Sequence, residues 1–101
     1  MPKLFEYLGI VIFFWSDEHE PIHVHGRYSD TEIKAEIILE EGEIKEIKFK
    51  NISGKKKFDT SKRKDFEIFI NHYAKEIVKS WADYFVWKKN IKPKSITRRL
   101  K

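Results

Sequence analysis

Three of the four histidines of this chain lie within seven residues of one another, at His19, His23 and His25. Imidazoles titrate near neutral pH, so a cluster of them can transfer protons in general acid–base catalysis. A His-x-His pair on a β-strand projects both rings from one face, because side chains alternate along a strand. His23 and His25 are therefore candidate catalytic residues. Together with His19 they are also candidate ligands for a divalent transition metal such as zinc, iron, nickel or manganese.

Structural roles compete with this chemistry. Histidines can occupy the polar face of a half-buried strand, or bond to the backbone or to Asp17. The sequence has no glycine-rich phosphate loop and no HExxH zinc motif, and spacing places no hydroxyl residue as a nucleophile. It also has no cysteine, which excludes disulfides, thiolate metal sites and cysteine nucleophiles.

The charges of the chain are unevenly distributed. Residues 1–46 hold four bases and eleven acids, whereas residues 47–101 hold seventeen bases and five acids. Such asymmetry favours an anionic partner, usually nucleic acid, although a lysine-rich surface can also serve solubility alone. The candidate binding residues come from two basic blocks, at residues 48–64 and 88–101, and are Lys55, Lys56, Lys57, Lys62, Arg63, Arg98 and Arg99.

Four β-strands are predicted in the first half of the chain, over residues 4–15, 22–28, 31–40 and 43–51. Their apolar residues alternate or form short runs, as in half-buried and central strands. In the last strand the alternation breaks between Ile44 and Ile47, which predicts a β-bulge. The short connections favour an antiparallel meander.

One long amphipathic helix is predicted within residues 60–90, because apolar residues recur every three or four positions from Phe66 to Phe85. Thr60 and Ser61 are its candidate N-caps. Residues 93–101 are expected to form a basic tail outside the core. The predicted fold is a single α+β domain over residues 1–101, a four-stranded antiparallel meander with this helix packed on one face. The histidines should lie on the open face.

The chain resembles a small prokaryotic family named domain of unknown function 4160. The resemblance covers roughly residues 4–85, and rests on the Gly-Ile-x-Ile segment that begins at Gly9, the Pro-x-His-x-His segment, and Trp81 near the helix end. It implies that Pro21, His23 and His25 are functional candidates and that Trp81 packs in the core. Genes of this family often lie beside another small domain, which implies a toxin–antitoxin-like pair.

Two hypotheses of function follow. The first is a small binding module that contacts a small partner protein, nucleic acid or both, with a homo-oligomer as a further arrangement. The second is an enzyme, a nuclease-like hydrolase that uses the histidines directly or through a bound metal. The longest apolar run, residues 9–15, is too short to cross a bilayer, and no signal peptide pattern is present. We therefore expect a cytoplasmic protein without membrane contact.

Overall fold

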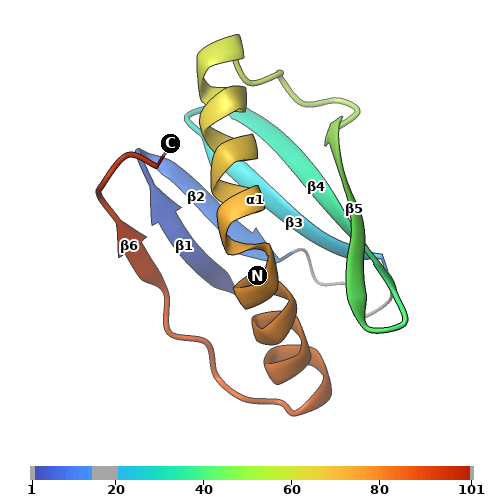
Figure 1. Cartoon of the computed structure of the whole chain (residues 1–101). Helices are drawn as coiled ribbons and strands as arrows, with labels where there is room; N and C mark the ends of the chain where they lie inside the picture. The colour runs from blue at the N-terminus through green and yellow to red at the C-terminus, as the bar shows by residue number, and fades with distance from the viewer. Residues whose placement is uncertain (1, 15–20, 101) are drawn as a thin grey trace.

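The structure is a computed structural model that describes residues 2–14 and 21–100. Within them, one long helix lies across a six-stranded sheet (Figure 1). The strands are β1 (Lys3–Tyr7), β2 (Ile10–Phe14), β3 (Ile22–Tyr28), β4 (Thr31–Glu40), β5 (Glu43–Asn51) and β6 (Lys94–Ile96). Helix α1 spans Thr60–Trp81 and continues as a π-helical turn, η1, over Ala82–Val86. The strand order is β5-β4-β3-β2-β1-β6.

The predicted α+β architecture is confirmed, but the four-stranded meander is wrong, because the sheet has six strands. Residues 4–14 of the first predicted strand form parts of two strands, β1 and β2, which pair antiparallel; residue 15 lies outside the described residues. Leu8 and Gly9 connect them with positive φ angles of 49° and 85°. Two such residues close a tight hairpin whose twist matches that of its strands. Because apolar residues lie on both sides of this turn, the sequence pattern indicates one continuous strand instead of two.

The sixth strand comes from the segment that was expected to be a free basic tail. β6 pairs parallel with β1 at the edge of the sheet. Beyond it, the backbone N–H of Leu100 donates to the hydroxyl of Tyr7 at 2.9 Å, and Arg99 Nη1 donates to Asp65 at 2.7 Å. Ile96 and Leu100 both pack against the core. The C-terminal segment is therefore part of the sheet and its packing.

Helix α1 begins at Thr60, as predicted, but its N-cap is the preceding residue. The carboxylate of Asp59 accepts a hydrogen bond from the backbone N–H of Lys62 at 2.8 Å. Below the cap, the helix buries one apolar stripe against the sheet: Phe66, Phe69, Ile70 and Ile77 are fully buried. In the described part of the chain, no helix is both long and apolar enough to span a membrane.

The predicted β-bulge is confirmed. The register between β4 and β5 shifts between Ile38, opposite Glu46, and Leu39, opposite Ile44, so Lys45 has no partner residue across the strands. Because side chains alternate, the extra residue lets both Ile44 and the later apolar residues of β5 pack against the core.

Candidate functional site

Strand β3 places His23, His25 and Arg27 on the sheet face away from α1. The alternate residues of the strand, Ile22 and Val24, are fully buried in the core beneath the helix, as the period of a strand predicts. The two imidazoles therefore project from the same side of the sheet.

Each of these histidines faces a glutamate of the neighbouring strand β4. Nδ1 of His23 lies 3.6 Å from a carboxylate oxygen of Glu36, and Nδ1 of His25 lies 3.8 Å from one of Glu32. Both distances are longer than an ordinary hydrogen bond, and either contact is an ion pair only when the imidazole is protonated. A carboxylate beside Nδ1 orients an imidazole and favours Nε2 as the nitrogen that accepts a proton or binds a metal.

Both glutamates are shared with a basic side chain. Arg27 Nη2 lies 2.9 Å from Glu32, and Lys50 Nζ lies 2.9 Å from Glu36. The pKa of the Glu36 carboxyl is lowered, mainly by the hydrogen bond from Lys50. The guanidinium of Arg27 also lies over the ring of Phe13, at 4.9 Å from its centroid. This face of the sheet thus carries two ion pairs, Arg27–Glu32 and Lys50–Glu36, next to the histidines.

The expectation that both histidines stand on an open surface is wrong for one of them. His25 is buried, with 7% of its surface exposed, and its ring packs against Phe13 at a centroid distance of 5.5 Å. Burial lowers the pKa of the His25 imidazole, while the Glu32 carboxylate acts in the opposite direction. The side chain of His23 remains 21% exposed. His23 is therefore the histidine that solvent or a ligand reaches more readily.

The three-histidine metal site stays a prediction. His19 and Asp17 lie outside the described residues. Residues 2–14 and 21–100 contain no group of three or more histidine, aspartate or glutamate side chains placed to hold one ion. His23 and His25 could supply two nitrogen ligands with carboxylates behind them, and any further ligand would have to come from elsewhere.

The predicted basic binding residues fall into two groups. Four of them bond to other parts of the chain: Lys56 to Asp30, Lys62 to the carbonyl of Leu8, Arg63 to Glu67, and Arg99 to Asp65. Each of these distances is between 2.7 and 2.9 Å, and all but the exposed Lys56–Asp30 pair are partly buried. Lys55, Lys57 and Arg98 are exposed and make no side-chain hydrogen bond or ion pair to another described residue.

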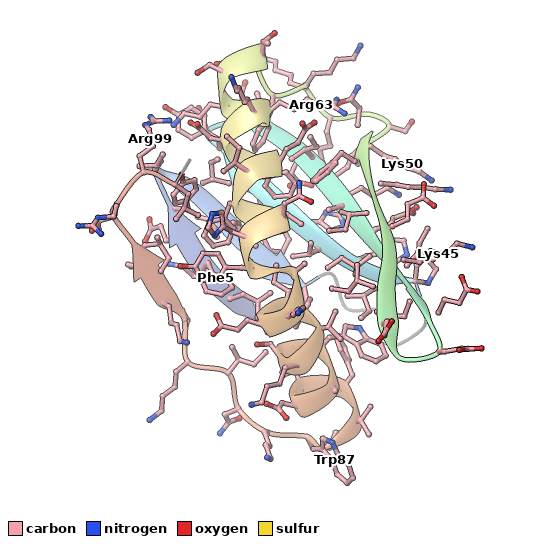
Figure 2. All side chains as sticks on the ribbon, viewed as in Figure 1. Phe5, Lys45, Lys50, Arg63, Trp87 and Arg99 are labelled. Carbon is pink, nitrogen blue, oxygen red and sulfur yellow. The ribbon has the colours of Figure 1, made fainter. Side chains whose placement is uncertain are left out.

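The fold brings part of each basic block, the start of α1 and the segment with Arg98 and Arg99, to one end of the molecule. The ion pair between Asp65 and Arg99 joins the start of α1 to residues that lie 34 positions later. Figure 2 shows Arg63 and Arg99 on opposite sides of α1, toward its N-terminal end. Lys64, which is exposed beside Asp65, joins the candidates on these structural grounds. The sequence-based candidates included its neighbours Lys62 and Arg63 but not Lys64, which is added because of the contact between Asp65 and Arg99.

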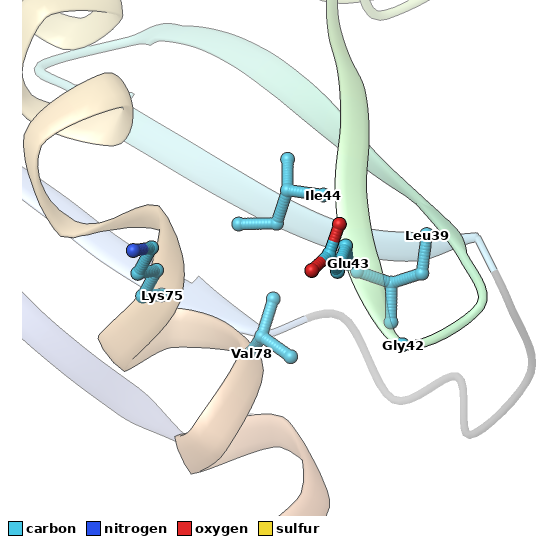
Figure 3. A pocket seen from close by; sticks show the side chains of 6 residues that line it. All are labelled: Leu39, Gly42, Glu43, Ile44, Lys75 and Val78. Atoms are coloured by element: carbon cyan, nitrogen blue, oxygen red, sulfur yellow. The ribbon is translucent and has the colours of Figure 1, made fainter.

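A hollow of about 490 Å³ lies between the β4–β5 hairpin and α1 (Figure 3). Leu39 and Ile44 line it from the strands, and Lys75 and Val78 line it from the helix. It lies on the helix side of the sheet, so the histidines of the opposite face do not line it.

Comparison with known proteins identifies the family. No curated protein and no solved structure matches the chain. A family model described as a domain of unknown function, DUF4160, matches residues 9–82. This range includes α1 and the strands β2–β5, of which β3 carries the histidines. Trp87 and the basic C-terminal segment lie beyond it. Because the match covers more than half of the sequence, the chain belongs to the DUF4160 family.

Proposed function

We propose that this protein is a small cytoplasmic binding module whose basic end contacts nucleic acid, within a toxin–antitoxin-like pair. One observation carries the nucleic-acid part: the Asp65–Arg99 ion pair joins the C-terminal segment, with the exposed Arg98, to the start of α1, with the exposed Lys64. The loop before α1 adds the exposed Lys55 and Lys57. These exposed cations, here called the basic end, are Lys55, Lys57, Lys64 and Arg98.

The electrostatics of α1 support this proposal. The helix dipole places partial positive charge at the N-terminus, where acidic side chains are favourable and basic ones are not. The first turn of α1 has no acidic residue and contains Lys62 and Arg63, and Lys64 follows directly. The N-cap carboxylate of Asp59 already accepts from the backbone N–H of Lys62, so the basic side chains supply most of the positive potential at this end. Phosphate groups are attracted to such a helix end.

The experiment measures binding of random-sequence DNA and RNA at a series of salt concentrations by fluorescence anisotropy. The triple variant Lys55→Gln, Lys57→Gln, Lys64→Gln should bind more weakly at low salt. For this variant, the slope of log affinity against log salt concentration should be shallower by about two, since each phosphate contact contributes roughly 0.7–0.9 to that slope. The matched control, Lys45→Gln, Lys48→Gln, Lys75→Gln, removes equal charge elsewhere and should bind nearly as the wild type does. Equal losses in both variants, or no binding by the wild type, would refute the proposal.

The partner protein is proposed from the family, whose genes often lie beside another small domain. Co-expression with the product of the adjacent gene should yield a complex that co-elutes on size exclusion, and the chain alone should elute as a monomer. Separate elution of the two proteins would contradict the pairing, and a dimer of the chain alone would favour the homo-oligomer.

A second candidate function is histidine-dependent hydrolysis, favoured by the His23–Glu36 contact of 3.6 Å. A carboxylate-oriented imidazole that solvent can reach is able to act as a general base. Nuclease activity should then be lost in His23→Gln and reduced in Glu36→Gln. Elemental analysis before and after chelator treatment tests the metal-dependent version. Equal activity in wild-type and His23→Gln protein from the same purification would reveal a contaminant.

A further inference from the structure

Two large apolar side chains in the described part of the chain stand mostly in solvent. Val86 is 55% exposed and Trp87 is 68% exposed. They lie at the end of the π-helical turn η1, where Figure 2 places Trp87 at the far end of the helix from Arg63. Tryptophan carries a large flat surface that is usually buried in a core or an interface. The fold does not bury most of this surface.

The backbone holds Trp87 in a defined position. Its N–H donates to the carbonyl of Ala82 at 3.1 Å, and the N–H of Lys89 donates to that of Asp83 at 2.8 Å. Between them Lys88 takes the left-handed conformation, with a φ of 58°, and ends the helix. Because these hydrogen bonds already order the backbone around the ring, binding to the ring costs little further ordering. Single π-helical turns are frequent at functional sites.

The surroundings of Trp87 are basic. From Trp87 to the end of the chain the sequence contains no acidic residue. Lys89 and Lys92 are exposed close to it in sequence. The nearest acids along the helix, Asp83 and Glu76, each pair with a lysine, at 3.4 and 3.2 Å. The segment that begins at Trp87 therefore combines an aromatic face with net positive charge.

The segment that begins at Trp87 leads to the basic end. Figure 1 shows it running from the end of the helix along the β6 edge of the sheet to the C-terminus. There Arg99 pairs with Asp65 near the start of α1, and Arg98 precedes it with an exposed side chain. A flexible anionic strand could thus follow a basic track from Trp87 to the basic end.

We propose that Trp87 is a stacking platform for a base of single-stranded nucleic acid, and that the phosphates of that strand contact the exposed Lys89 and Lys92. The inference rests on the proposed function and specifies its ligand. Stacking on exposed aromatic rings beside basic grooves is how proteins bind single strands without sequence preference. In a duplex the bases already stack on one another, so their faces are not accessible for stacking on Trp87. A protein partner fits less well, because lysine is depleted in protein interfaces. A lipid surface would need an apolar helix face, and that of α1 covers the sheet.

The test uses the full-length protein and labelled single strands of about 12 nucleotides, with a duplex of equal length as comparison, at low salt. Trp87→Ala should weaken single-strand binding by about 5- to 100-fold and leave duplex binding unchanged. Trp87→Phe, which retains a ring, should lose less. Val86→Ala is the matched control and should bind as the wild type does. Because both side chains are exposed, thermal melting should be similar in all four proteins.

The outcomes separate this inference from the proposed function. If the wild type binds and Trp87→Ala loses no more than Val86→Ala, the stacking role is wrong while the basic end stands. If the wild type binds neither strand form, both proposals fail. If Trp87→Ala instead abolishes sedimentation with phosphatidylserine vesicles or dissolves a dimer, the surface serves a lipid or a second copy, and the stacking role is again overturned.

Discussion

At His25, burial and a neighbouring carboxylate act on the pKa in opposite directions. Burial has the larger effect and lowers the pKa below the ordinary 6.5, Glu32 raises it, and Lys34 and His23 lower it further. The imidazole of the folded protein therefore stays neutral at pH values where that of the unfolded chain is protonated. The unfolded state then binds more protons, so acid favours unfolding.

We expect the contribution of His25 to the free energy of unfolding to be complete above pH 6.5 and to decline as the pH falls through the lowered pKa. Urea titrations of the wild type and His25→Gln across this range should show a flatter pH profile for the variant. The carboxyl of Glu36 has a pKa lowered from 4.5, mainly by Lys50, so its contribution is lost only at more acidic pH. Glu36→Gln should therefore reduce the acidic decline, to which Asp30 also contributes, and keep the near-neutral one. Parallel wild-type and His25→Gln profiles would contradict the assignment.

Among the elements, the close packing of α1 on β3 depends on Gly26. A Cβ at this position would lie 2.6 and 2.7 Å from ring atoms of Phe66 and 3.3 Å from the side chain of Ile10. Phe66 is fully buried and has aromatic neighbours at 6.0 Å, Phe49 and Phe58, so its ring has little room to move. The absence of a side chain at Gly26 thus lets the helix lie directly over the strand that carries the histidines.

Gly26→Ala should destabilise the protein by about 1–3 kcal/mol, the range for overpacked cores, measured as the free energy of unfolding in urea. The double variant Gly26→Ala, Phe66→Leu has a smaller side chain opposite the new methyl group. It should therefore be more stable than the sum of the two single losses predicts. Strict additivity would show that the methyl group and the Phe66 ring do not collide.

Across the whole molecule, the C-terminal segment connects parts that are distant in sequence. β6 extends the sheet beside β1, Leu100 bonds to Tyr7, and Arg99 pairs with Asp65. Asp65 is buried, with 6% of its surface exposed, so removal of Arg99 would leave a buried carboxylate without this ion pair.

Deletion of residues 94–101 should lower the melting temperature by about 5 °C or more, since a loss of 1 kcal/mol shifts a domain of this size by roughly 4–8 °C. Scanning calorimetry measures this. The control Lys92→Gln, Arg98→Gln removes two charges but keeps the strand and its apolar contacts, and should melt close to the wild type. An unchanged melting temperature after the deletion would show that the segment is dispensable, as expected from its composition alone.

Local patterns in the sequence determined the strands over residues 22–28, 31–40 and 43–51, the start of α1 and the bulge in β5. The shared face of His23 and His25 also followed, because the strand period acts over a few adjacent residues. Even the hairpin between β1 and β2 is local, although the apolar residues around Leu8 and Gly9 concealed it.

Only the tertiary structure decided what those residues face. The register of β3 against β4 sets His23 opposite Glu36, and the packing against Phe13 buries His25. The place of β6 and the pairing of Arg99 with Asp65 depend on contacts between segments far apart in the chain. Such contacts form where burial and charge pairing of both segments are satisfied together, and composition alone specifies neither the partner nor the register.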